Sequence, residues 1–398
     1  MAMGGSIGTA LFINIGGGLA KGGPLSLLLG FTIYALILSC VNNCIAEMTV
    51  LHPVPGGFIR MAGKGVDDAF GFMAGWNFFL YEAYPRRRGG SRLHCFLLHD
   101  AFGFRHWRDP GPLAEYLNKG NLGRFEGFLG SPWMASFTTV GPEYITLIAA
   151  ETKHPRTYVK KAFQTVFWRF PLFFITATIS VGILVPRQQI WLVHLIIAMQ
   201  NLRISGLPHV TNALLVTIIF SAGNTYMYCA SRSVPIYCVL VTICFPLLSL
   251  LQLGDASSQV LTWLTNILTA GGLINYFTMA VTYVFFCRAC KAQGVDRTAF
   301  PYYGRLQPYA AWVGVIGEGL IIIFFGYGSF WPWDISTFFT NYTMVIFAFM
   351  VRPLEALEAD LLCERVEIDF YERSTHGRAA EGVLEGDRGM GGVEEGRQ

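Results

Sequence analysis

The chain has 398 residues, of which 53% are hydrophobic and only 14% are charged. Soluble domains carry about a quarter of charged residues, so this composition argues against a soluble globular protein. The net charge of +3 comes without a basic stripe interleaved with aromatic residues, which argues against nucleic acid as a partner. The nine cysteines are scattered, mostly within apolar blocks, which argues against a disulfide framework.

The apolar residues are concentrated in blocks of about twenty, the length that crosses a bilayer as a helix. These blocks must be helical, because a backbone in lipid has to satisfy its own hydrogen bonds. We therefore predict an all-α polytopic membrane protein with about ten transmembrane helices in contact with the lipid bilayer. The candidate spans cover residues 2–20, 24–46, 68–85, 132–151, 166–185, 209–230, 235–253, 263–287, 308–328 and 333–351, with Gly and Pro at several of their ends.

The first span contains a glycine-rich run at residues 4–9, GGSIGT. Three glycines and two hydroxyl residues in six positions make a poor continuous helix. Two interpretations are open. The run is either a packing surface of small residues or an unwound stretch whose free N–H groups, helped by the dipole of the half-helix, bind a carboxylate.

A second interruption is predicted in the span at 132–151, where residues 136–144 read SFTTVGPEY. Pro142 has no N–H and frees a carbonyl in mid-span, and free carbonyls can hold an ammonium group. Glu143 is an ionisable residue near the middle of the bilayer, which marks a functional site by default. The alternative is a protonated, hydrogen-bonded structural glutamate. One break that offers N–H groups and another that offers carbonyls suit a zwitterionic substrate.

No enzyme, cofactor or metal site is expected. GxSxG and HExxH motifs are absent. Cys287 and Cys290 form a CxxC, but a structural zinc site needs about four ligands and no second pair lies nearby, so an ordinary reduced pair is expected. Other polar residues of the apolar blocks are predicted to be interhelical hydrogen-bonding groups. They include Glu47, Glu82, Asn275 and Glu318.

Lys and Arg residues set the predicted orientation. With the N-terminus in the cytoplasm, most loops predicted to be inside carry Lys or Arg and most outside loops carry few, so both termini are predicted to be cytoplasmic. The exception is the polar segment 86–131, which is Arg-rich although it falls outside. We divide the chain into a transmembrane domain at 1–352 and an acidic, Gly-rich cytoplasmic tail at 353–398.

Several runs of the sequence resemble fungal amino acid permease proteins of the amino acid–polyamine–organocation superfamily. The resemblance covers most of residues 1–352 and depends on fairly specific motifs. They are GGSIGTALFINIGGGLAKGGP, AEMTVLHPVPGGFIRMAGKGVDDAFGFMAGWNFF, FGFRHWRDPGPLAEYLNKGNLGRFEGFL, SFTTVGPEYITLIAAETKHPRTYVKKAFQTVFWR and LPHVTNALLVTIIFSAGNTYMYCASRS.

The resemblance implies a LeuT-type inverted-repeat transporter fold and proton-driven uptake of amino acids, with a location in the plasma membrane. It implies that backbone groups of Ser6, Ile7, Gly8 and Thr9 take the substrate carboxylate. Carbonyls near Ser136, Phe137 and Thr139 would take the amino group, with Gly141 at the break and Glu143 just beyond it.

The sequence departs from the family between about residues 84 and 102, within the polar segment 86–131. The family has twelve spans, and its fourth and fifth are not recognisable here, because the stretch RRRGGSRLHCFLLHD resembles neither. The transporter fold is therefore expected to be incomplete. Loss of the fifth span removes a usual location of coupling groups, so the alternative function is a non-transporting sensor or regulator, or an inactive truncated paralogue.

Overall fold

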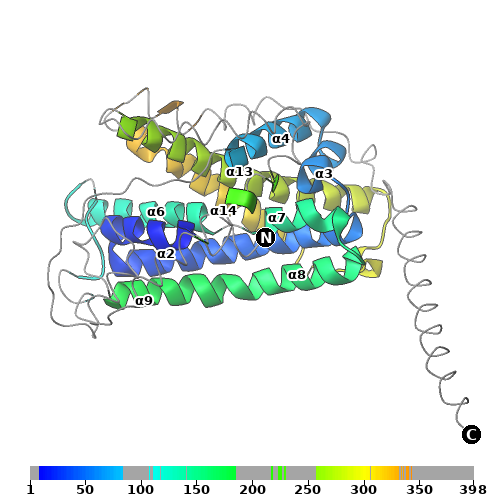
Figure 1. The fold of residues 1–398 in the computed structure, drawn as a ribbon, viewed down its shortest axis with the longest axis horizontal. Helices are drawn as coiled ribbons and strands as arrows, with labels where there is room; N and C mark the ends of the chain where they lie inside the picture. The colour runs from blue at the N-terminus through cyan, green and yellow to red at the C-terminus, as the bar shows by residue number, and fades with distance from the viewer. Residues whose placement is uncertain are drawn as a thin grey trace, which may run out of the picture.

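The structure, a computed structural model, describes residues 9–83, 107, 111–116, 118–139, 141–184, 217, 223–225, 228, 229, 257–304, 306–330, 333, 335, 338, 339 and 342. These residues form helices that lie lengthwise beside one another (Figure 1), and their β structure is an isolated antiparallel bridge between Phe330 and Trp333. Some predicted segments lie outside the described residues: 2–8, 86–106, 235–253, 353–398, and most of 209–230 and 333–351.

Helix α2 (Thr9–Leu51) consists of two helices joined at a sharp turn. Gly23 has φ 79° and ψ 175°, a conformation that glycine adopts readily, and Pro24 starts the second half. The chain folds back here, because a Cβ atom on Gly18 would lie 2.6 Å from Leu27 Cδ1, whereas a straight helix would hold these residues far apart. The boundary predicted between the first two spans is therefore confirmed.

The segment 111–116 closes this turn through backbone hydrogen bonds. The Ala114 amide donates to the Gly22 carbonyl (2.9 Å), and the Leu25 amide donates to the Pro112 carbonyl (3.0 Å). These bonds satisfy groups at the end of one helix and the start of the next, where intrahelical partners are lacking. Part of the segment predicted to be a polar loop is thus fixed to the tip of the α2 hairpin.

Helices α3 (Gly57–Gly65) and α4 (Asp68–Ala83) follow as a closely packed pair. A Cβ atom on Gly71 would lie 2.7 Å from the Gly63 Cα, so these two glycines let the backbones approach closely. Between the helices the Asp67 carboxylate accepts a hydrogen bond from the Ala69 amide (2.9 Å). Helix α4 matches the span predicted to begin at residue 68.

Helix α6 (Asn121–Thr138) begins earlier than the predicted start at residue 132, so this predicted boundary is wrong. The first turns of α6 contain several glycines and Glu126, which lower the hydropathy on which the prediction relied. Glu126 is nevertheless buried, and its carboxylate accepts hydrogen bonds from the backbone and side-chain amides of Asn118 (3.1 and 2.7 Å). The helix is followed by a break and then by α7 (Pro142–Ile148).

After the short turn η1 (Ala149–Glu151), helix α8 (Pro155–Arg169) continues through the π-helical segment η2 (Phe170–Ile175) into α9 (Thr176–Leu184). Pro171 lies in η2, and a proline lacks the N–H of the regular α-helical ladder, which explains the local change of pitch. Together these elements form one long rod beside α2 (Figure 1). The rod contains the predicted span 166–185 and starts before it.

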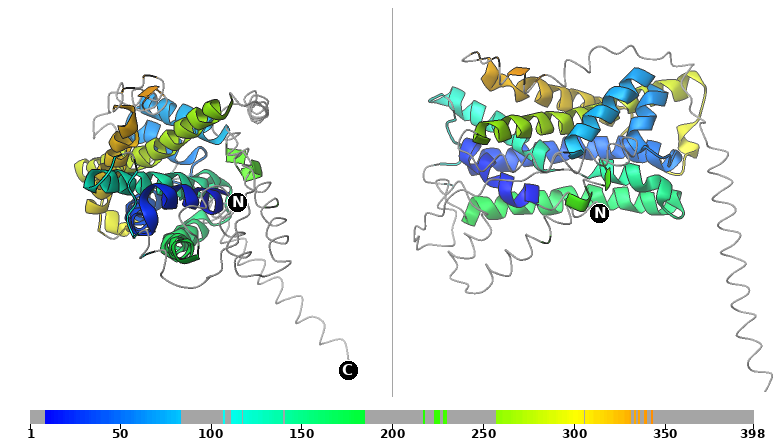
Figure 2. Two further views of the ribbon diagram at one scale, coloured as in Figure 1. Left: turned by 90° about the vertical axis from the view of Figure 1, so that its left-hand side faces the viewer. Right: turned by 45° about the horizontal axis from the view of Figure 1, so that its top comes forward.

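Helices α13 (Ser257–Ala292) and α14 (Tyr309–Phe325) pack against each other and against α2. They are connected through the turn η4 (Arg297–Ala299), and η5 (Tyr327–Ser329) follows α14. Helix α2 therefore lies between the α8–α9 rod on one side and α13 and α14 on the other (Figures 1 and 2). The predicted spans 263–287 and 308–328 fall on these two helices.

Three helices of the described part are long and apolar enough to cross a membrane, and a fourth apolar helix is shorter. The outer face of α14 is covered with exposed apolar side chains, as expected of a helix that faces lipid on one side. The three long helices are Lys21–Leu51, Pro155–Ile183 and Thr269–Ala292, and the shorter one is Tyr309–Phe324. The exposed side chains of α14 include Trp312, Ile316, Leu320 and Ile323.

The α2 turn gives a first testable prediction. A Cβ atom in Gly23→Ala would lie 2.8 Å from the Pro112 carbonyl oxygen, at a backbone φ of +79°. We expect this variant to lower the free energy of unfolding by about 1–3 kcal/mol. In the control Gly120→Ala the φ is +82° but no atom lies within 4 Å of the new Cβ, so only the backbone strain applies. Thermal unfolding of both purified proteins in detergent measures the difference. Equal losses would show that the contact with the segment 111–116 has no effect.

Candidate functional site

The helix break between α6 and α7 is the centre of the candidate site. Thr139 is extended (φ −95°, ψ 100°), and Gly141 has φ 156° and ψ −42°, which disfavours any side chain. Pro142 begins α7 and has no N–H to donate to the preceding turn. The Gly141 amide, which would bond back to the Phe137 carbonyl in a continuous helix, donates to Glu143 Oε2 (3.0 Å). The predicted interruption at Gly-Pro is confirmed.

Glu143 connects the two sides of this break to α13. The residue is 1% exposed, and besides the Gly141 amide its carboxyl group accepts a hydrogen bond from the Tyr276 hydroxyl, 2.9 Å from both oxygens. The sequence left open a hydrogen-bonded structural glutamate and a functional one. The structure shows that the side chain is hydrogen-bonded, at a position directly beyond the unwound residues.

Further polar groups surround the break. The Tyr144 hydroxyl on α7 donates to Glu82 on α4 (3.3 Å), and the Asn77 side chain donates to Asn275 on α13 (2.8 Å). All four side chains belong to buried residues. Glu82 and Asn275 therefore form interhelical hydrogen bonds as predicted. Glu318 interacts with the Tyr34 hydroxyl of α2, but neither of its carboxyl oxygens makes a hydrogen bond of standard geometry in the described part of the chain.

The residues of the predicted site are only partly brought together. Ser136, Thr139, Gly141 and Glu143 lie at the α6–α7 break and are all buried. Phe137 belongs to the last turn of α6. Thr9 is the first residue of α2, whereas Ser6, Ile7 and Gly8 lie outside the described residues.

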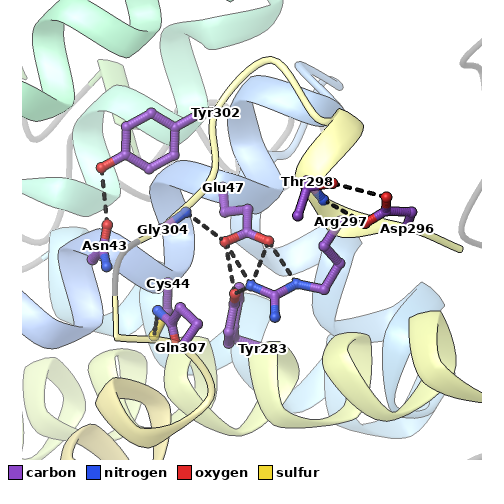
Figure 3. A network of polar contacts seen from close by, with 10 residues as sticks. All are labelled: Asn43, Cys44, Glu47, Tyr283, Asp296, Arg297, Thr298, Tyr302, Gly304 and Gln307. Carbon is purple, nitrogen blue, oxygen red and sulfur yellow. Dashed lines mark hydrogen bonds and ion pairs between the residues drawn. The ribbon is translucent and has the colours of Figure 1, made fainter.

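A second polar centre surrounds Glu47 near the end of α2 (Figure 3). Glu47 is fully buried, and Arg297 donates to both of its oxygens, from Nε to Oε1 (2.9 Å) and from Nη2 to Oε2 (3.0 Å). The Tyr283 hydroxyl (2.7 Å) and the Gly304 amide (3.0 Å) also donate to Oε2. The cation and the two further hydrogen-bond donors offset much of the desolvation cost of burying this carboxylate.

The charge of Arg297 is stabilised by this arrangement. Burial alone would lower the pKa of the guanidinium, but the Tyr283 hydroxyl and the Glu47 carboxylate raise it, and the net shift is upward. Asp296 positions the arginine, because its carboxylate accepts hydrogen bonds from the Thr298 amide and hydroxyl at the start of η4. These two bonds hold the pKa of Asp296 below its ordinary value.

The loop after η4 is attached to α2 at two more points. The Tyr302 hydroxyl donates to the Asn43 side-chain oxygen (2.9 Å), and the Gln307 amide donates to the Cys44 sulfur (3.1 Å). The sequence predicted hydrogen bonding for Glu47 but missed this ion pair and these contacts. The sequence did offer one indication, because an acidic residue within a membrane span usually pairs with another polar or charged group.

Comparison with known proteins places the chain among transporters. The family model described as "Amino acid permease" matches residues 1–84, 96–238 and 232–358. The unmatched residues 85–95 lie in the stretch where the sequence departs from the family's fourth and fifth spans.

Individual relatives are similar over most of their length. The General amino acid permease AGP2 of Saccharomyces cerevisiae is 33% identical, with 87% of this chain and 75% of the relative covered. The Dicarboxylic amino acid permease of the same yeast is 25% identical, over 86% of this chain and 73% of the relative. The Proline-specific permease of Emericella nidulans is 26% identical, over 87% of this chain and 81% of the relative.

The Glu47 centre gives a stability prediction. Arg297→Ala leaves a buried carboxylate without its cation, and we expect the free energy of unfolding to fall by about 3–5 kcal/mol. The matched control is Arg124→Ala, because Arg124 pairs with Glu115 at 3.9 Å with both side chains largely exposed. Removing such a surface pair should change stability by about 0–1 kcal/mol.

Thermal or denaturant unfolding in detergent measures both effects. The double variant Glu47→Gln with Arg297→Met should recover part of the loss, because it leaves no unpaired charge behind. If Arg297→Ala is no less stable than Arg124→Ala, the ion pair does not hold this end of the bundle together.

Proposed function

This chain belongs to the amino acid permease family and is an amino acid transporter of the membrane, not an enzyme, and from this premise we propose that it takes up amino acids together with protons by alternating access. The observation that carries the proposal is the unwound, buried break between α6 and α7, with Glu143 directly beyond it. Discontinuous helices at mid-membrane are a common way in which transporters present backbone polar groups to a substrate.

The proposed site recognises the zwitterionic part that amino acids share. The substrate ammonium group would bind main-chain carbonyls near Ser136, Phe137 and Thr139. The deviation of Gly141 from helical geometry supports this assignment, because the amide that would complete the α6 ladder is turned towards Glu143.

The substrate carboxylate would bind the backbone amides of residues 6–9. Amides at the end of a half-helix carry a partial positive charge that favours an anion. This half of the site depends on Ser6, Ile7, Gly8 and Thr9 and follows from their glycine-rich sequence.

The proposed fold, cellular membrane and orientation are those that membership of the family suggests. We propose an incomplete LeuT-type inverted-repeat fold of about ten helices in the plasma membrane, with both termini in the cytoplasm. The distribution of Lys and Arg in the loops supports this orientation. The Glu47–Arg297 pair then lies at the cytoplasmic end of the bundle.

A non-transporting sensor is the second candidate function. The gap in the family match at 85–95 favours it, because two spans of a complete transporter would be missing around that point. A sensor would bind amino acids without flux.

Uptake by permease-deficient cells that express this chain tests the proposal. We expect accumulation of radiolabelled amino acids that collapses when a protonophore removes the proton gradient, with surface expression measured in parallel. Binding without uptake, at normal surface expression, would favour the sensor and contradict transport.

Substitution at the break tests the binding site. Gly141→Ala should strongly reduce uptake, because a side chain is disfavoured at the Gly141 backbone conformation and the unwound residues would shift. Gly120→Ala is the matched control, because Gly120 is also a helix-capping glycine with positive φ, at the other end of α6. Equal uptake by the two variants would show that the break does not contribute to substrate binding.

A further inference from the structure

Glu318 is a buried acid that the hydrogen-bonding pattern does not explain. It lies in the interior of α14, is 0% exposed, and neither carboxyl oxygen has a hydrogen-bond partner within the described residues. Helix α14 has a length of about 26 Å at 1.5 Å per residue, so Glu318 lies close to the middle of the bilayer. An ionised carboxylate at this depth would be very unfavourable without a partner.

The contrast with Glu47 is informative. Both carboxyl groups are fully buried, but Glu47 has a guanidinium and two further donors, whereas Glu318 has no cation among the described residues that face it. A carboxyl group in the second situation becomes neutral by binding a proton. Glu318 is therefore a proton-binding position by its environment.

Tyr34 is the titratable group of the described helices that faces Glu318. It lies on α2, is fully buried, and interacts electrostatically with Glu318 although the two make no hydrogen bond of standard geometry. Among the described side chains of α13 and α6, the other helices packed against α14, none is a charged group that acts on Glu318.

The same tyrosine also feels the charge of a residue at the helix break. Tyr34 also interacts electrostatically with Tyr81 and Glu143, and Tyr276 interacts with Tyr34 and hydrogen-bonds to Glu143. Hydroxyl groups both donate and accept hydrogen bonds, so they can conduct a proton between two carboxyl groups. Of these groups, Tyr276 and Glu143 are joined by a hydrogen bond, whereas the Tyr34 hydroxyl makes no hydrogen bond of standard geometry to either of them.

We propose that Glu318 is a proton-carrying residue of the transport cycle and that Tyr34 relays its proton towards the α6–α7 break. It takes a proton from water on one side of the membrane to become a carboxylic acid, and returns that proton to water on the other side. No other bond is made or broken. This inference rests on the proposed proton-coupled transport.

Two assays on purified protein in liposomes test this inference. In Glu318→Gln the side chain is permanently neutral, so exchange of labelled for unlabelled amino acid should persist while accumulation driven by a pH gradient is lost. A pH-sensitive dye inside the liposomes should then report no substrate-dependent proton entry. Tyr34→Phe should slow coupled accumulation more than exchange.

Glu126→Gln is the matched control, because Glu126 is also a buried acid but accepts hydrogen bonds from Asn118. It should keep gradient-driven accumulation. If wild-type protein shows no proton-driven uptake, the proposed function itself fails. If wild type and Glu318→Gln accumulate substrate equally, the coupling stands and the role of Glu318 is overturned.

Should Glu318→Gln not reach a folded state, Glu318→Asp replaces it in the same assays. A shorter acid that still binds the proton should keep coupling with a shifted pH dependence. A pH profile identical to that of wild type would overturn the inference.

Discussion

A carboxyl group that leaves water has to be neutralised by a cation, by hydrogen-bond donors or by a proton, and the arrangement of the bundle depends on this requirement. Glu47 binds Arg297 and so fastens the loop after α13 to the end of α2. Glu143 accepts hydrogen bonds from Tyr276 and a backbone amide, which connects α7 with α13. Glu318 has no cation and no hydrogen bond of standard geometry among the described residues. Glu47 and Glu143 therefore hold parts of the structure together, whereas Glu318 is the acid for which we propose a chemical role.

Glycine and proline set the shape within which these acids lie. Gly23 and Pro24 reverse the chain so that the halves of α2 pack together, and Gly141 and Pro142 end α6 within the buried interior. Both sites use the same physical rule: proline removes a donor and glycine tolerates the backbone angles that result. The bends are therefore determined locally, whereas the acids are paired through contacts between helices.

This division explains what could be predicted from sequence. The α2 reversal and the α6–α7 break were predictable because Gly and Pro act on their immediate neighbours. The start of α6 at Asn121 was missed because hydropathy does not detect a glycine-rich helix whose acid, Glu126, is satisfied by a nearby side chain. The Glu47–Arg297 pair was missed because a separation of 250 residues leaves no local pattern. The binding of the substrate carboxylate by residues 6–9 and of its ammonium group near residues 136–139 stays a prediction.

That separation has a consequence for how the protein is made. Glu47 enters the membrane early in synthesis, while Arg297, 250 residues later, has not yet left the ribosome. Until the later helices arrive, Glu47 lacks the cation that it binds in the folded protein, and an ionised form would be costly anywhere but near the lipid headgroups. The α2 hairpin is therefore inserted before the contact that holds its end is available. We expect its depth and tilt in the membrane to become fixed only after the last third of the chain has been inserted.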